Sequence, residues 1–289
     1  MRDTRDMLLV LLSSLLMLTG CSRRDILDDY PVSGVEISLD WNGVTNKLPE
    51  GVRVIFYPKN AEGRKIDTYL SVKGGKVKVP PGRYSVVVYN YDTETVQIRG
   101  EEAYETIEAF TGHCNGLGIA GTEQLVWGPD PLYVVRIDDL KIENSEEELQ
   151  LNWKPKLVVK TYSFKLKVQG LEYVSSIVGS IEGMSSCYDL GLGCGKAGDS
   201  PIYFAARGSA GEVTGSFTVF GTSEGVISRA GNAIKLTLAF VKTDNKVQKM
   251  EVDITEVIAN SESGGSGGGD DGDEPFKEIA VSYTHLTLP

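Results

Sequence analysis

The sequence predicts an all-β protein built from two tandem β-sandwich domains. Short segments in which apolar and polar side chains alternate recur along the chain, and turn residues separate them. Amphipathic helical segments of ordinary length are scarce. Evenly spaced short strands of this kind are typical of immunoglobulin-like sandwiches. The chain has 289 residues, of which 41% are hydrophobic and 24% charged, so it can form packed cores.

The first predicted domain spans residues 31–153. The segment 83–90 reads Arg-Tyr-Ser-Val-Val-Val-Tyr-Asn, and its β-branched and aromatic residues predict a central strand buried on both faces. Residues 101–110 are expected to form a short helix or an irregular edge, and the acidic segment 143–149 a connection. The strands are expected at 35–41, 52–57, 65–72, 76–79, 83–90 and 131–137.

The second predicted domain spans residues 154–281, after a boundary near 152–156. Each half would then supply about seven strands, as in a small sandwich. Residues 170–176 are expected to form a helical turn or a loop, and the Gly- and Asp-rich segment 261–274 a flexible linker. The strands are expected at 157–168, 177–183, 211–220, 232–241 and 246–254, with the start of another at 275–281. Residues 282–289 resemble translated sequencing-adapter sequence, so we predict a foreign, poorly ordered tail.

The N-terminus resembles a bacterial lipoprotein signal peptide. A short apolar run, Met7–Leu18, follows a charged start and is too short to span a bilayer comfortably. It is followed by Leu18-Thr-Gly-Cys21, which resembles a lipobox. The resemblance implies removal of residues 1–20, attachment of lipid to Cys21 through a thioether, and acylation of the new amino terminus by a fatty acid such as palmitate. The alternative is an ordinary secretory signal, or an apolar anchor helix, in which Cys21 is incidental.

Residues 21–30 are expected to form a short lipidated tether at the outer membrane. Asp25, Asp28 and Asp29 weakly resemble the acidic signal that sends Bacteroidetes lipoproteins to the cell surface, although Arg23 and Arg24 interrupt it. The cell surface is therefore the expected location, and a periplasm-facing orientation stays open.

Composition and motifs argue against several functional classes. A formal net charge of −11 argues against nucleic-acid binding, because the chain could not neutralise a phosphate backbone. The chain contains neither Gly-x-Ser-x-Gly nor His-Glu-x-x-His, and it has two histidines. His113 and Cys114 are neighbours that would point in different directions on a strand, so they make a poor metal site or nucleophile pair. We expect no catalytic residue, metal or cofactor, and no enzymatic activity.

Three cysteines remain besides Cys21. Cys187 and Cys194 bracket the flexible sequence Tyr-Asp-Leu-Gly-Leu-Gly, and an envelope location permits disulfides. The sequence leaves two alternatives open, a Cys187–Cys194 bridge and two free thiols. Cys114 is expected to be a buried or half-buried thiol.

Several motifs together resemble the fimbrillin-like lipoproteins of Bacteroidetes, which include type V pilus subunits and their anchors. They are the segment around Val79-Pro-Pro-Gly-Arg-Tyr84, the segment 164–174, Gly179-Ser-Ile-Glu-Gly-Met184, and the linker before Glu278-Ile-Ala-Val281. The resemblance implies two transthyretin-like sandwiches and a role in pilus assembly, anchoring or adhesion. Its partners would be pilin-like subunits that add a strand to an open sheet edge.

The resemblance favours an anchor or accessory subunit over a shaft subunit. Shaft subunits are matured by cleavage after Arg or Lys. Arg53 and Arg64 lie within or between predicted strands and offer no convincing cleavage loop.

The alternative function is a glycan-binding surface lipoprotein of a polysaccharide-uptake system. Such proteins stack sugars on exposed aromatic rings. Trp41 and Trp153 are expected to pack inside the protein. Trp127 opens the Gly- and Pro-rich segment Trp127-Gly-Pro-Asp-Pro131, where an aromatic side chain is more often exposed, and is the candidate ligand contact.

Overall fold

The computed structural model describes residues 33–60, 63–114, 124–145, 147–197, 200–221, 233–263, 276–280 and 286–287. The predicted signal peptide, the tether and Cys21 lie outside these residues. The described part is almost entirely β-structure, so the predicted all-β fold class is confirmed. Within these residues no helix is both long and apolar enough to cross a membrane.

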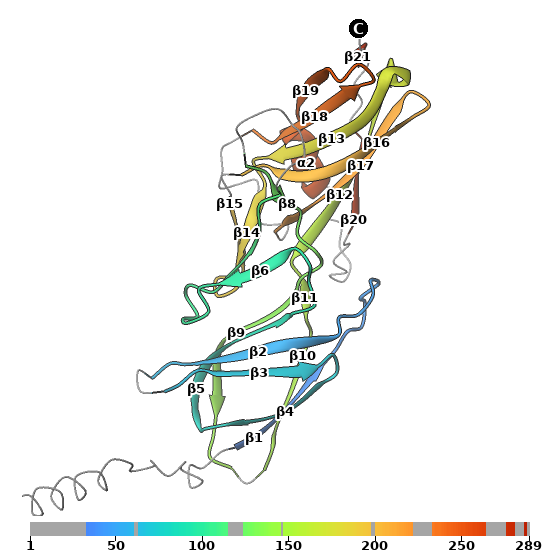
Figure 1. Ribbon diagram of the computed structural model, residues 1–289. Helices are drawn as coiled ribbons and strands as arrows, with labels where there is room; N and C mark the ends of the chain where they lie inside the picture. The colour runs from blue at the N-terminus through green and yellow to red at the C-terminus, as the bar shows by residue number, and fades with distance from the viewer. Residues whose placement is uncertain are drawn as a thin grey trace, which may run out of the picture.

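Eight strands form sheet A, which lies at one end of the molecule (Figure 1). Their order across the sheet is β10-β1-β4-β3-β2-β5-β9-β11. They are β1 (Ser33–Leu39), β2 (Gly51–Pro58), β3 (Ile66–Ser71), β4 (Gly74–Val79), β5 (Gly82–Asn90), β9 (Tyr133–Ile142), β10 (Leu149–Trp153) and β11 (Lys156–Leu157).

The remaining strands belong to sheet B, whose central path runs β19-β18-β13-β16-β17-β14-β7-β6. Strand β12 pairs with β17, β15 with β14, and β8 with β16. The strands are β6 (Val96–Arg99), β7 (Glu108–Thr111), β8 (Val126–Trp127), β12 (Val159–Gln169), β13 (Val174–Glu182), β14 (Ser185–Asp189), β15 (Cys194–Ala197), β16 (Ile202–Ser209), β17 (Glu212–Phe220), β18 (Lys235–Lys242), β19 (Val247–Asp253), β20 (Phe276–Ala280) and β21 (Leu286–Thr287). Among the described residues, two helices accompany them: the 3-10 helix η1 (Leu171–Tyr173) and α2 (Thr255–Ser263).

The two sheets exchange strands across the predicted domain boundary. Strands β6, β7 and β8 precede residue 153 in sequence but belong to sheet B, where β7 pairs with β14 and β8 with β16. Apart from these three, the strands of sheet A end at Leu157 and those of sheet B begin at Val159. The boundary near 152–156 therefore separates the sheets only outside the segment 96–127. Pairing between strands so distant in sequence leaves no local pattern to predict it.

Three apolar cores hold this arrangement together. The sheet A core includes Val35, Ile37 and Trp153, and the sheet B core includes Phe164 and Phe240. The third, which we call the junction core, lies where β2, β5 and β9 of sheet A face β6, β7 and β14 of sheet B. Its members include Ile55, Val87, Val134, Ala109, Tyr188 and Phe220. Burying large apolar side chains here joins the two sheets.

Strand β5 confirms the prediction of a central strand buried on both faces. Val86 and Val88 point into the sheet A core, while Val87 and Tyr89 point into the junction core. Alternate residues of a strand face opposite sides, so a strand between two cores needs apolar residues at every position. The run of three valines meets that need.

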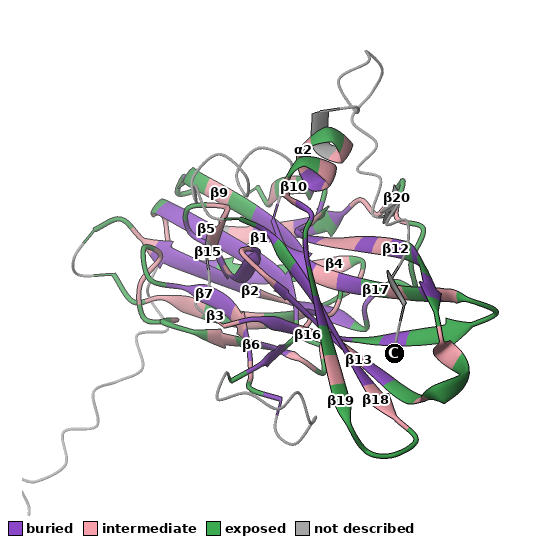
Figure 2. Ribbon diagram, turned by 90° about the horizontal axis from the view of Figure 1, so that it is seen from above, coloured by how far each residue is buried: buried purple, intermediate pink, exposed green. Residues whose placement is uncertain are grey.

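Helix α2 is a difference from the sequence prediction, which placed no helix there. Ile258 is buried against the sheet B core, and most of the helix stays at the surface (Figure 2). The segment 101–110, expected to be a short helix or an irregular edge, forms turns that lead into β7.

Candidate functional site

Strand β12 carries a sheet edge that a short, separately connected strand covers. Along one edge β12 pairs with β17 in antiparallel register from Val159 to Lys167. Along the other edge β20 pairs with it in parallel at Thr161 to Lys165. Parallel pairing is slightly less stable per residue than antiparallel pairing, and β20 contributes only five residues. Without β20, this part of β12 would offer unpaired backbone groups to another chain.

Strand β20 follows the Gly- and Asp-rich segment that the sequence predicts to be a linker. The predicted strand at 275–281 is confirmed as β20, whereas residues 264–275 lie outside the described part of the chain. Of the predicted foreign tail, 282–289, the structure describes only β21, which pairs with Val168 and Gln169 of β12. The rest of the tail, and so the prediction of poor order, falls outside the described residues.

The outward face of β12 and β17 is lined by small polar side chains. Thr161 lies opposite Thr218, and Ser163 lies opposite Ser216. Beyond these pairs an open groove of about 620 Å³ continues along the same face past Lys165 of β12, Thr214 of β17, and Ala205 and Arg207 of β16. The groove thus begins where the two sheets meet and combines hydroxyl and charged groups with apolar surface.

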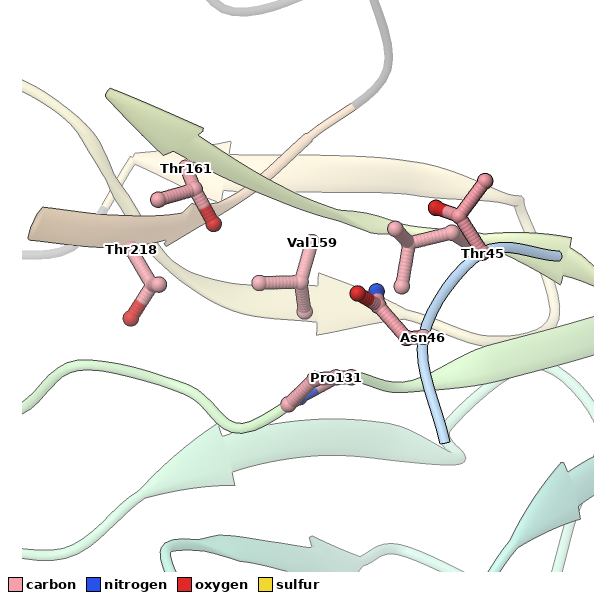
Figure 3. Close-up of a pocket in the computed structure, with 7 residues that line it drawn as sticks. Thr45, Asn46, Pro131, Val159, Thr161 and Thr218 are labelled. Carbon is pink, nitrogen blue, oxygen red and sulfur yellow. The ribbon is translucent and has the colours of Figure 1, made fainter. Parts of the chain in front are cut away.

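At its inner end this face runs into a cavity of about 180 Å³, which we call the junction pocket. Figure 3 shows Thr161 and Thr218 on one side of the pocket, Val159 at its centre, and Asn46 and Pro131 of sheet A connections opposite. The remaining lining residues are Thr45 and Leu157. The pocket therefore combines hydroxyl and amide groups with a few apolar surfaces, and it adjoins the first paired residue of β20.

Trp127 lies beside this face, on β8. It pairs with Tyr203 of β16, and the two rings meet edge to face with centroids 5.4 Å apart. The indole is 38% exposed. The chain then passes over β17 at Gly128, where a Cβ atom would lie 2.6 Å from the Thr218 hydroxyl oxygen, so a larger residue would clash. Trp127, the candidate ligand contact from the sequence, is therefore an exposed aromatic, as expected. Trp41 and Trp153 pack in or against the sheet A core.

A charged cluster ties the β6–β7–β14–β15 part of sheet B together beside the junction core. Glu108 accepts hydrogen bonds from Arg99 and from the Lys196 ammonium, the latter at 2.8 Å, and Lys196 also lies 2.9 Å from the Asp189 carboxylate. Burial alone would raise the pKa of Glu108, but the hydrogen bonds from Lys196 and Arg99 outweigh burial and lower this pKa. The Asp189 side chain is only 2% exposed, so its charge depends on Lys196 for compensation.

Arg53 of β2 ties sheet A to the turn between β6 and β7. Its guanidinium donates to both oxygens of Asp67 on β3 at 2.6 and 2.9 Å, and to both oxygens of Glu101 at the same two distances. It also donates to the Tyr89 hydroxyl at 2.7 Å. The hydrogen bonds from Arg53 lower the pKa of Asp67. Arg53 is thus a clamp within a strand, which agrees with its rejection as a cleavage site.

The three described cysteines are free, so the Cys187–Cys194 bridge considered from the sequence is absent. The register gives the reason. Cys187 lies opposite Lys196 and Cys194 lies opposite Asp189, which places the two cysteines on a diagonal of the β14–β15 hairpin. Diagonal positions are about 7–8 Å apart at Cα, beyond the usual reach of a disulfide. Cys114 is buried, as expected.

The chain is similar to a family of proteins, to a named relative and to solved structures. Residues 20–205 match a family described as a domain of unknown function, DUF5119. The Fim4B protein of Bacteroides ovatus, which carries the provisional name of fimbrium anchoring subunit, is 62% identical over 279 residues, 92% of this chain and 84% of its own. A crystal structure from the same species, provisionally described as an adhesin, is 54% identical with a TM-score of 0.75, covering 93% of this chain and 99% of that one. The fimbrial anchor protein Mfa2 of Porphyromonas gingivalis shares the fold, with a TM-score of 0.55 at 10% identity over 87% of this chain and 90% of that one.

Proposed function

The chain belongs to the DUF5119 family, and we propose that it is an anchoring or accessory subunit of a type V-like fimbrium. The observation that carries this proposal is the 62% identity to Fim4B across most of both chains. The match confirms the resemblance to fimbrial proteins of Bacteroidetes that the sequence suggested. The role is structural or adhesive, in the cell envelope or at the cell surface.

The edge of β12 is the place that we propose for contact with a neighbouring fimbrial subunit. A strand from that subunit would replace β20 and form backbone hydrogen bonds along β12. The junction pocket lies next to the start of this edge and offers room for a side chain of the incoming strand.

Deleting the gene tests the anchoring function and should release fimbriae from cells or abolish them, as seen by electron microscopy. Unchanged, cell-attached fimbriae would contradict the proposal.

We further propose that lipid on Cys21 holds the protein in the outer membrane. Replacing Cys21 with Ser should reduce incorporation of radiolabelled palmitate to background, because the thioether needs the sulfur atom. Fimbriae should then appear in the culture medium. Cys114→Ser is the matched control, since its buried thiol should not affect labelling. Label retained by the Cys21 variant would disprove lipidation at this residue.

The orientation that we propose faces the cell surface, in keeping with the acidic residues after Cys21. Antibody labelling of intact cells distinguishes the two orientations. Labelling that requires a permeabilised outer membrane would place the protein on the periplasmic side.

A second candidate function, binding of a neutral glycan, is favoured by one observation. The outward groove combines hydroxyl groups of Thr and Ser with an exposed Trp127 at its side. Sugars are commonly bound by aromatic stacking together with polar groups that form hydrogen bonds.

For this second function, Trp127→Ala should abolish saturable binding on a glycan array, because the stacking surface is removed. Tyr173→Ala is the matched control, since Tyr173 is an exposed aromatic in η1, outside the segment Trp127–Gly128 that lies over Thr218. Equal loss of binding in both variants, or no binding by the unaltered chain, would reject the glycan function.

A further inference from the structure

Strand β1 enters sheet A at the end farthest from sheet B. Its first residue, Ser33, lies opposite Val79, just before the turn that leads into β5. Its last residue, Leu39, lies opposite Trp153, and the chain continues from Trp153 into β11 and then β12 of sheet B. Figure 1 shows β1 at the end of sheet A away from β13, β16 and β18. The N-terminal segment and sheet B are therefore attached at opposite ends of β1.

The other covalent connections from sheet B reach sheet A at the Leu39 end as well. Strand β5 leaves towards β6 at Asn90, and β9 returns from β8 at Tyr133. These two residues are joined by a hydrogen bond from the Tyr133 N–H to the Asn90 amide oxygen at 2.7 Å. The ring of Tyr133 also meets Trp41, which follows β1. A pull from sheet B thus reaches sheet A at this end through all three connections among the described residues.

Strand β1 is paired along both edges. It runs parallel to β10 from Val35 opposite Leu149 to Leu39 opposite Trp153. It runs antiparallel to β4 along its other edge from Ser33 to Ser38. A pull on Ser33 directed away from sheet B acts along the axis of β1. Because the load is parallel to the strand, the hydrogen bonds on both sides share it at once instead of breaking one after another.

The side chains of β1 strengthen resistance to sliding. Val35, Ile37 and Leu39 are buried in the sheet A core, so moving β1 along its axis would expose all three. A slip of a single residue would turn this apolar set to the opposite face of the sheet. On the other face, the Gln150 amide donates to Glu36 at 2.8 Å, a further link between β1 and β10.

We infer that β1 has a second function as the load-bearing strand of the molecule, held in shear between β10 and β4. This inference rests on the proposed anchoring function, because only a tethered subunit carrying a fimbrium is pulled between its N-terminal segment and sheet B. Tension on the fimbrium would then reach the tether through the β1–β10 and β1–β4 pairs. The strength of the attachment would depend on how slowly β1 leaves the sheet under force.

Single-molecule pulling tests this inference on the chain from residue 21 onwards, with Cys21→Ser to prevent lipidation. One handle is fixed to the N-terminus. The other is fixed to an azide-bearing residue at position 210, in the turn between the central strands β16 and β17. The variant E36C/Q150C, with Cys114, Cys187 and Cys194 replaced by alanine, places two thiols at directly paired positions of β1 and β10. Paired strands lie about 4.8 Å apart, which suits a disulfide.

Reduced molecules should release sheet A in their first rupture, as β1 leaves. Oxidised molecules should lose that event and rupture first at a higher force. Once every strand between the two handles has opened, the total released length of oxidised molecules should be shorter by roughly 390 Å, at about 3.4 Å for each residue enclosed between positions 36 and 150. The matched control K235C/D253C joins β18 to β19, outside the load path, and should leave the first rupture force unchanged.

Equal first ruptures in oxidised and reduced E36C/Q150C, or sheet B opening first in both, would overturn the inference. The result is independent of the anchoring function itself. If fimbriae stay attached without this protein while β1 still resists as expected, the proposed function fails, and what stands is the resistance of β1 to a pull along its axis.

Discussion

Replacing Arg53 with methionine is expected to destabilise the chain by about 3 kcal/mol and to lower its melting temperature by roughly 6–12 °C. The guanidinium binds Asp67 and Glu101 through both oxygens of each carboxylate and is only 15% exposed. Its removal leaves two half-buried carboxylates without the cation that binds both of them. The turn that carries Glu101 would then lose both hydrogen bonds from Arg53 and keep the one from the Tyr57 hydroxyl of β2 to the Glu101 carbonyl.

Denaturant unfolding followed by circular dichroism measures this loss. The free energy of unfolding of Arg53→Lys should lie between those of the unaltered chain and Arg53→Met, because an ammonium keeps the charge but cannot bind two carboxylates in a fork. Arg83→Met is the matched control, since Arg83 pairs with Asp139 on the same sheet but is 63% exposed, and exposed pairs contribute little. A loss for Arg53→Met as small as that for Arg83→Met would show that the clamp adds nothing to stability.

The acid side of the stability curve gives a second measurement. The pKa of Asp67 is lowered in the folded chain by the hydrogen bonds from Arg53. The pair therefore stabilises the fold above the ordinary carboxyl pKa, and this contribution is lost as the pH falls through the lowered value. In Arg53→Met the free energy of unfolding should therefore fall less steeply as the pH drops below the ordinary carboxyl pKa. Arg83→Met should keep the steep fall of the unaltered chain.

Local pattern was enough to predict the strands whose side chains alternate or are wholly apolar. Strands β2, β5, β12 and β17 were expected close to their observed bounds, because burial on one or both faces imposes a period that the sequence displays. Strand β10 was not expected, because the sequence prediction placed an acidic connection at 143–149 and no strand after it in the first domain. Its partner β1 lies more than a hundred residues earlier, and no local signal identifies such a partner.

The division into domains shows the same limit more clearly. Strands β6 and β8 contain four and two residues, too few for a recognisable period. Strand β6 belongs to sheet B because its partner β7 pairs with β14, and β8 belongs to it because it pairs with β16. Both partners lie far along the chain. Helix α2 was missed for a related reason. It buries mainly Ile258, so its sequence carries little of the apolar stripe that identifies an amphipathic helix.

The candidate site was accessible to sequence reasoning only in part. The Gly- and Pro-rich context of Trp127 correctly indicated exposure, because such loops lie at the surface. The groove beside it depends on Thr161 meeting Thr218 and Ser163 meeting Ser216 across paired strands. Taken singly, these residues are ordinary outward positions of a sheet. Only the register brings them together.

Removing residues 264–289 is expected to turn β12 into an acceptor for a strand supplied in solution. The truncated chain lacks β20 and β21, so the backbone groups that they occupy on β12 become available. A synthetic peptide of residues 275–281, which ends before the predicted foreign tail, should bind the truncated chain in the micromolar range. The complete chain should bind it far more weakly, because its own β20 competes at a high effective concentration through the short connecting segment.

Titration calorimetry measures both affinities, and a peptide with proline at both 278 and 279 is the control. Successive residues of a strand direct their N–H groups to opposite sides, so one of the two prolines removes a donor that faces β12. The control peptide should not bind. If the truncated chain does not bind the unaltered peptide, or if both chains bind it equally, β20 is not an exchangeable strand. Contact with a neighbouring fimbrial subunit would then have to be sought away from the β12 edge, first at the groove beside Trp127.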